Sequence, residues 1–276
     1  MKNPDIPITD DHIHIDPVNG RGLESVKDFM RAGGTHLFLV TKPSSSFGIM
    51  PRTGREYTQV FDETIAVADQ ARSLGICVFV VLGIHPAEIS RLLEEIPLPG
   101  AVAAMKKGLD IAASYIAEGK AVALKSGRPH YPVPGEVLSA SNDVLSHALA
   151  LAAELDCAVQ VHAETGPCND IVALAERAGL SPCRVVKHYA TSDTPLTPSF
   201  LATHPDIPEL ARIHRSFTME SDYMDENSRP GAVIGPKSVP RYTTQLVASG
   251  QMSVEDCFFI HAETIGRVYG VTVDLK

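Results

Sequence analysis

Two histidines near the start of the chain have the spacing of a metal-binding pair. His12 and His14 are separated by one residue, Ile13, and follow Asp11. In an extended strand, side chains two residues apart point to the same face, so both imidazole rings would lie on one side of the chain. Neutral imidazole is the commonest metal ligand in proteins, and two neighbouring ring nitrogens can share one ion. The pair indicates a metal site, provided that further ligands converge on it.

Three more candidate ligands stand at the ends of later apolar runs. These are His162, His188 and Asp222. A single histidine at a strand end is more often a packed polar residue than a ligand, but a series of such residues in order favours a shared site. Three or four neutral imidazoles with a carboxylate suit zinc, and also manganese, iron or nickel, so we expect one or two divalent ions.

Short apolar runs alternate along the chain with stretches of helical period. The runs are rich in Val, Ile, Leu and Phe and cover residues 6–15, 36–41, 77–83, 121–126, 158–162, 184–188, 199–203 and 217–222. The helical stretches cover residues 23–32, 56–74, 101–117, 136–155, 168–178, 207–214, 240–248 and 254–269. This alternation predicts an α/β protein, a (β/α)8 TIM barrel forming one domain over residues 1–276. The strand ends of a closed barrel surround one axis, as convergence of the five ligands requires.

The composition narrows the classes of partner. Hydrophobic residues make up 44% of the chain and charged residues 21%, which is ordinary for a protein with a sizeable core. The net charge of −9 makes stable nucleic-acid binding unfavourable, so we expect a small-molecule or phosphoester substrate. Five widely spaced cysteines, a start without a signal-peptide pattern and the lack of a long apolar run predict a cytoplasmic protein without a membrane partner. The sequence leaves the oligomeric state open.

Several stretches together carry a family resemblance. They are DHIHID (11–16), GIHP (83–86), SGRPHYPV (126–133), VQVHAET (159–165), VVKHYA (185–190) and ESDYMDENSRPGAVIGPKSVPR (220–241). Through them almost the whole chain resembles the TatD-like metal-dependent hydrolases of the amidohydrolase superfamily, in particular their archaeal branch. The resemblance implies a TIM barrel with a one- or two-metal centre, held by His12, His14, His162, His188 and Asp222.

The fourth strand departs from the family pattern. The family usually has a glutamate there, in a GEIG-like motif that bridges two metals, whereas this chain has Lys125. A protonated lysine would be repelled by two divalent cations. Lys125 could instead react with carbon dioxide and become an anionic carbamate that bridges two ions, as in the related phosphotriesterase, urease and dihydroorotase centres. It could also stay an amine beside a single ion, or point away as a structural residue.

The expected chemistry is hydrolysis by a metal-activated water molecule at the barrel mouth. Asp222 is the candidate catalytic residue, because one carboxylate oxygen can touch the metal while the other accepts the proton of the water. Candidate substrate-binding residues are His85, Arg128, His130 and Tyr131, of which Arg128 would offer its guanidinium to an anion. TatD resemblance makes DNA phosphodiester hydrolysis the nominal activity. The alternatives are hydrolysis of a lactone, amide or phosphoester through a carbamylated binuclear centre, and a metal-binding barrel without turnover.

Overall fold

Nine parallel strands form one curled sheet in the computed structural model, which describes residues 6–228 and 233–275. The strands are β1 (Thr9–His14), β2 (His36–Val40), β3 (Cys77–Gly83), β4 (Ala123–Gly127), β5 (Ala158–His162), β6 (Val185–Lys187), β7 (Thr197–Leu201), β8 (Thr218–Glu220) and β9 (Tyr223–Met224). Their order is β8-β7-β6-β5-β4-β3-β2-β1-β9, so β1 to β8 lie side by side in chain order. This sequential parallel order is that of a (β/α)8 barrel and confirms the predicted fold.

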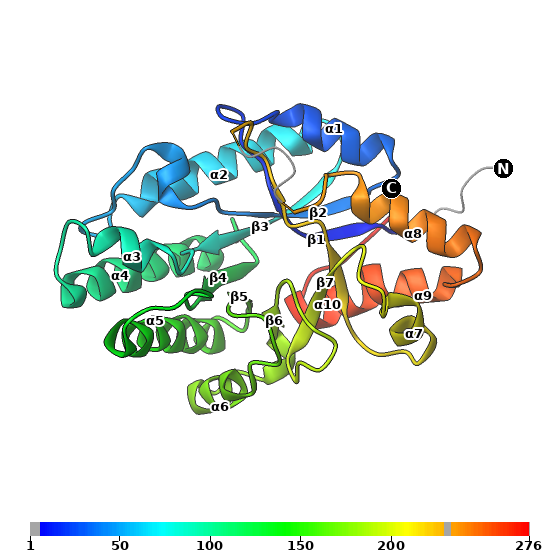
Figure 1. Ribbon diagram of the computed structural model, residues 1–276. Coiled ribbons are helices and arrows are strands. Elements are labelled where there is room, and N and C mark those ends of the chain that lie inside the picture. Colours follow the sequence, from blue (N-terminus) through cyan, green and yellow to red (C-terminus); the bar gives the residue numbers. More distant parts are fainter. Residues whose placement is uncertain (1–5, 229–232, 276) are drawn as a thin grey trace.

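Helices surround the strands (Figure 1). They are α1 (Leu23–Arg31), α2 (Tyr57–Arg72), α3 (Glu88–Leu92), α4 (Leu98–Ala117), α5 (Gly135–Glu154), α6 (Asn169–Ala178), α7 (Ile207–Arg212), α8 (Ser238–Ala248), α9 (Val254–Phe258) and α10 (Thr264–Tyr269), with short 3-10 turns at Ser44–Phe47 and Pro182–Arg184. Helix α3 was not expected. The helix expected over 254–269 is interrupted between α9 and α10 by a π-helical turn, Phe259–Glu263.

The strands are buried on both faces. One face packs against the outer helices, through residues such as Leu37, Val80 and Val159. The other face points into the barrel and forms a second cluster with α10, made of Phe38, Val40, Val81, Ala123, Ala158, Val186, Ile265, Val268 and Tyr269. Side chains of α10, Ile265, Val268 and Tyr269, therefore complete the core on the inward face of the strands. Because side chains alternate along a strand, the inward face continues to polar residues at the mouth: Ala123 is followed by Lys125, and Val186 by His188.

A single strand was expected over 217–222, but the structure has two short strands in this region, separated by a bend. Strand β8 ends at Glu220, and β9 begins at Tyr223 and pairs with β1. Between them, Asp222 has a positive φ of 45°. Its backbone N–H donates to the carbonyl oxygen of His12 over 2.9 Å, and the N–H of Ser221 donates to Oδ1 of Asp10 over 3.0 Å. The bend thus joins the last strands to the first and brings Asp222 beside His12.

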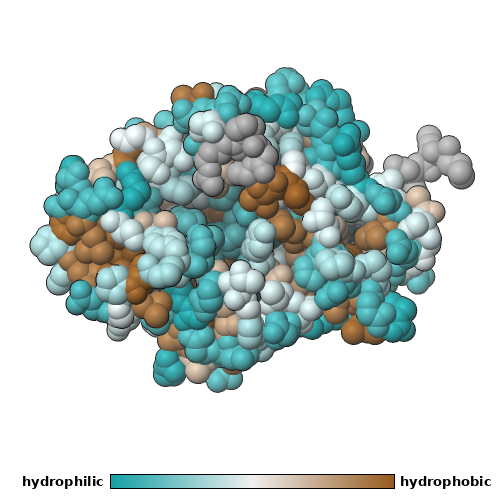
Figure 2. Space-filling view, in the orientation of Figure 1, coloured by the Kyte–Doolittle hydropathy of each residue, from teal (hydrophilic) through white to brown (hydrophobic). Residues whose placement is uncertain are grey.

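Among the described residues, no helix combines the length and apolar character needed to cross a bilayer. Figure 2 shows a largely hydrophilic surface on the face that it draws, with separate smaller hydrophobic areas. Single exposed apolar side chains of this kind are ordinary on folded proteins.

Candidate metal centre

His12 and His14 on β1 turn their rings toward each other. Their Nε2 atoms are 3.2 Å apart. Nδ1 of His14 lies 2.8 Å from the carbonyl oxygen of Val40 and donates its proton there, which leaves the Nε2 lone pair available. Burial lowers the pKa of His14 to about 3 and also lowers that of His12. Both rings are therefore neutral at neutral pH, as metal ligands must be.

Asp222 and His188 complete a three-residue cluster with His12. One ligand atom of each lies within 4.8 Å of the others. Among the described residues, these three form the one group of side chains close enough together to hold an ion. Oδ1 of Asp222 is 3.8 Å from Nε2 of His12, and the rings of His12 and His188 stack with centroids 4.3 Å apart. Burial raises the pKa of Asp222, an effect that Lys125 and Lys187 oppose. Neutral imidazoles with one carboxylate are a donor set that fits a divalent metal ion.

His162 lies on the other side of His188. Nδ1 of His162 is 2.7 Å from Nε2 of His188, and Nε2 of His162 is 2.7 Å from Nδ1 of His130. Burial is the largest cause that lowers the pKa of His162 and of His188, so both rings are neutral. The pair offers a second position for an ion, next to the cluster of His12 and Asp222.

Lys125 stands among these predicted ligands. Its Nζ lies 3.1 Å from Nε2 of His12, and its side chain is almost completely buried. Burial lowers the pKa of Lys125, while the carboxyl groups of Asp222, Glu220 and Asp11 act in the opposite direction. The structure thus brings all six predicted metal-centre residues to one end of the barrel. A protonated Lys125 does not fit between two cations, whereas a neutral amine or a carbamate does.

A buried glutamate beneath the centre was missed by sequence reasoning. Glu220 is inaccessible to solvent and accepts a hydrogen bond from the backbone N–H of Tyr189 over 2.7 Å. Its Oε1 lies 3.5 Å from Nδ1 of His188. Burial raises the pKa of Glu220 well above its usual range. The available signal was its place in a buried apolar run, two residues before the predicted ligand Asp222.

The four predicted substrate residues have different surroundings. His85 packs against His162, with ring centroids 4.4 Å apart, and His130 contacts His162 directly. The hydroxyl of Tyr131 lies at the rim, 2.9 Å from Oγ of Ser90.

Arg128 is bound to protein carboxylates, which differs from the expected anion pocket. Its Nε donates to Glu164 over 2.8 Å and its Nη2 donates to Asp170 over 3.0 Å. These contacts tie the end of β4 to the segment after β5 and to the first turn of α6. Its guanidinium is thereby engaged before any substrate arrives, because Glu164 and Asp170 already occupy the planar fork that an anion would use.

A cavity of about 220 Å³ opens beside His162 and His188. Its lining includes His130, His162, His188 and Asp222 together with Lys187, Thr165 and Tyr189. Lys187 directly precedes His188 in the sequence. It is buried, and its Nζ donates to the carbonyl oxygen of His188 over 2.8 Å. The cavity therefore combines a cation with the candidate metal ligands.

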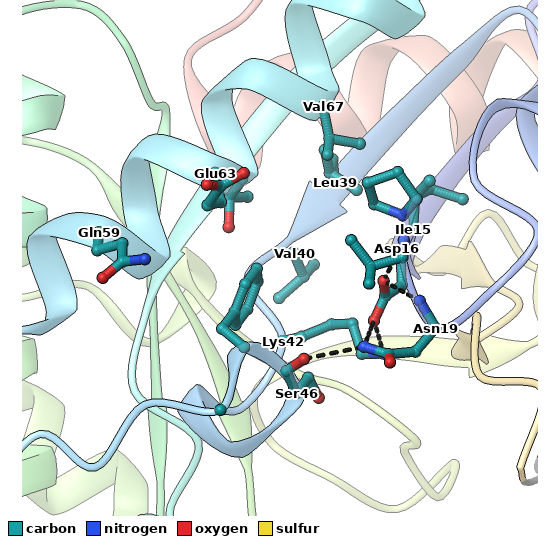
Figure 3. A pocket seen from close by; sticks show the side chains of 15 residues that line it. Ile15, Asp16, Asn19, Leu39, Val40, Lys42, Ser46, Gln59, Glu63 and Val67 are labelled. Atoms are coloured by element: carbon teal, nitrogen blue, oxygen red, sulfur yellow. Dashed lines mark hydrogen bonds and ion pairs between the residues drawn. The ribbon is translucent and has the colours of Figure 1, made fainter.

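A larger cavity, of about 380 Å³, lies between α2 and the carboxyl ends of β1 and β2 (Figure 3). Its polar wall contains the buried pair of Lys42 and Asp16, whose Nζ and Oδ2 are 2.7 Å apart, and Glu63 and Gln59 face it from α2. Its described lining residues include no histidine. The candidate metal ligands His162, His188 and Asp222 border the smaller cavity instead.

Comparison with known proteins gives one family. A model described as TatD-related DNase matches residues 9–270. An uncharacterised protein of Methanocaldococcus jannaschii is 32% identical over 282 residues, covering 98% of both chains. Two similar solved structures are a TatD-like protein from Archaeoglobus fulgidus (TM-score 0.60, 17% identity, 95% of this chain and 100% of that one) and a TatD homologue from Escherichia coli (0.63, 16%, 96% and 98%). A variant of a phosphotriesterase-like lactonase from Deinococcus radiodurans has a TM-score of 0.64 at 10% identity, covering 96% and 95%.

Proposed function

The chain belongs to the TatD-related DNase family, and from that membership we propose that it is a single-domain, metal-dependent hydrolase. The observation that carries the proposal is the meeting of His12, His14, His162, His188 and Asp222, of which the last three line one cavity. The odd number and wide spacing of the cysteines support a cytoplasmic location.

The residues divide into two groups of ligands. His12, His14 and Asp222 would hold a first ion, and His162 a second together with His188, which stands between the two groups and also lies within the cluster of His12 and Asp222. We propose zinc first, because neutral imidazoles with a carboxylate are its usual ligands, and manganese, iron or nickel as alternatives. A bound divalent ion would activate water at neutral pH and polarise the phosphoryl or carbonyl group under attack.

Asp222 is the proposed proton acceptor. Its carboxylate borders the cavity with 15% of the side chain exposed, so water can reach it. Burial raises its pKa toward neutrality, where a carboxylate is a more effective general base than at its ordinary pKa. Asp222 would take the proton of the attacking water while Lys187, also at the cavity, offers positive charge to an anionic substrate. The family description refers to DNA, and the negative charge of a phosphodiester would be attracted by the ammonium group of Lys187.

The alternative is a binuclear centre bridged by a carbamate on Lys125. It rests on the position of Nζ among the ligands and on the lowered pKa of Lys125. The neutral amine would form an N–C bond with carbon dioxide and release one proton, which leaves an anionic bridge in place of the missing glutamate. Such a centre would suit a lactone, amide or phosphoester. The Deinococcus lactonase variant shares the fold of this chain.

Metal loading and a substrate panel test the proposal. The protein is stripped with a chelator, reloaded with zinc, manganese or nickel, and assayed for ions per chain and for hydrolysis of a phosphodiester, a phosphotriester and a lactone. Metal-dependent phosphodiester hydrolysis is the expected result. Lactone or phosphotriester hydrolysis that rises with bicarbonate would favour the carbamate centre. Ion binding without turnover would identify a non-catalytic barrel, and failure to bind any ion would contradict the proposed function.

A further inference from the structure

A row of three imidazole rings runs from the surface to the metal centre. His130 follows β4, His162 ends β5 and His188 follows β6. The two links of the row are Nδ1 of His130 to Nε2 of His162, and Nδ1 of His162 to Nε2 of His188, each 2.7 Å long. His162 thus uses both of its ring nitrogens, one toward each neighbour.

A neutral imidazole has one N–H and one lone pair, so only one nitrogen of His162 can bind an ion. His162 and His188 would hold the proposed second ion, and the atoms that they turn toward each other are Nδ1 of His162 and Nε2 of His188. The proton of His162 must then sit on Nε2, and Nδ1 of His130 must accept it. Metal-binding histidines commonly donate their second N–H in this way, usually to a carboxylate, a carbonyl or water. Here the acceptor is another histidine.

The backbone of Gly127 and Arg128, just before His130, packs directly against the backbone of His162. The N–H of Arg128 donates to the carbonyl oxygen of His162 over 2.8 Å. A Cβ atom at Gly127 would lie 1.8 Å from that same oxygen, so only glycine allows the approach. Arg128 also anchors its side chain to Glu164, two residues after His162. The segment that carries His130 is therefore built against the histidine that it contacts.

We propose that His130 is a positioning residue, which holds His162 in the tautomer and orientation that present Nδ1 to the second metal ion. This inference rests on the proposed function, since it requires an ion at His162 and His188. It changes the role expected for His130 from direct substrate binding to control of a metal ligand. The exposed Nε2 of His130 would carry the proton of that ring, because its Nδ1 must act as the acceptor.

Three substitutions separate positioning from other roles. His130→Asn places an amide oxygen near the position of Nδ1, His130→Gln places it near the position of Nε2, and His130→Ala removes the acceptor. His147→Asn is the matched control, because His147 lies on α5 and pairs with Asp110 away from the centre. Zinc affinity and ions per chain are measured in chelator-buffered zinc, with circular dichroism as the check on folding.

We expect His130→Ala and His130→Gln to weaken the second zinc site by about 10- to 100-fold, the usual effect of removing a partner of a metal-binding histidine. His130→Asn and His147→Asn should bind zinc as the wild type does. Equal affinity in all His130 variants, or a change in KM alone, would overturn the inference while leaving the hydrolase proposal intact. So would zinc binding that is unchanged in His162→Ala. A wild-type protein that binds no zinc would instead contradict the proposed function itself.

Discussion

Nζ of Lys125 lies 3.1 Å from Nε2 of His12, the same nitrogen that His12 turns toward His14. In this position Lys125 either donates a hydrogen bond to the lone pair that an ion needs, or is converted to an anion that supports the ion. The two states of Lys125 should affect metal binding in opposite directions. The amine competes with the ion for the lone pair of His12, whereas the anionic carbamate adds a ligand.

For the carbamate centre, we expect bicarbonate to raise zinc occupancy toward two ions per chain in the wild type. Lys125→Glu should hold two ions without bicarbonate, because it supplies a carboxylate directly, and Lys125→Ala should hold one. Lys120→Ala, at an exposed lysine, is the control. Electron density for an unmodified amine beside a single ion, in a crystal of the zinc-loaded protein, would exclude the carbamate.

Asp222→Asn should lower kcat by about 10²- to 10⁴-fold through loss of the general base. Asparagine is the suitable replacement because Asp222 has a φ of 45°, a conformation that Asn tolerates better than most residues. The folded state should persist, with an unchanged circular dichroism spectrum. Asp193→Asn, in an exposed loop, should retain full activity. Full activity of Asp222→Asn in metal-loaded protein would remove Asp222 from the mechanism.

Arg128→Lys should lower the free energy of unfolding rather than raise KM. Lysine cannot reproduce the planar contacts with Glu164 and Asp170. Because those carboxylates are 43% and 58% exposed, solvent screening limits the loss to about 1–2 kcal/mol. Urea denaturation measures it, and Arg212→Lys at an exposed pair should cause no measurable change. A raised KM with unchanged stability would restore Arg128 as a substrate ligand.

His261 should make the protein sensitive to acid independently of the metal centre. Its Nδ1 accepts a hydrogen bond from the N–H of Thr9 over 3.2 Å, and burial lowers its pKa to about 4 from 6.5. Between these values the unfolded chain binds a proton that the folded chain does not, so stability is present above pH 6.5 and falls toward pH 4. The difference corresponds to roughly 3 kcal/mol.

The comparison is between wild type and His261→Gln, both metal-free, by urea denaturation from pH 7 to pH 4. The variant should be less stable at pH 7 but lose roughly 3 kcal/mol less on acidification. Parallel stability curves for the two proteins would show that His261 does not carry this proton linkage.

The order of the strands and the convergence of the predicted ligands could be predicted from the sequence, because both follow from the apolar runs and from the polar residues at their ends. Apolar runs mark buried parallel strands, and a polar residue at each run's end must reach the mouth once the strands curl together. His188 and Asp222 are 34 positions apart in sequence, yet alternation along β6 and the pairing of β9 with β1 bring them within one cluster.

Other features depend on contacts that no local pattern encodes. Strand β9 has two residues and exists only through pairing with β1. The residues next to Arg128 in the sequence do not indicate whether its guanidinium binds an anion or protein carboxylates. It binds Glu164 and Asp170, and Asp170 is within reach because α6 begins beside Arg128. The π-helical turn that contains His261 interrupts an otherwise continuous helical pattern.

The bend between β8 and β9 couples the position of Asp222, the proposed proton acceptor, to the pairing that closes the barrel. Asp222 keeps its position through its backbone bond to His12 and through the pairing of Tyr223 and Met224 with β1. Fraying of those few bonds on warming would withdraw the carboxylate while the helices stay folded. Heat inactivation should therefore begin below the melting temperature of the protein. The loss of catalytic activity would report the opening of the pairing between β9 and β1 before the protein unfolds as a whole.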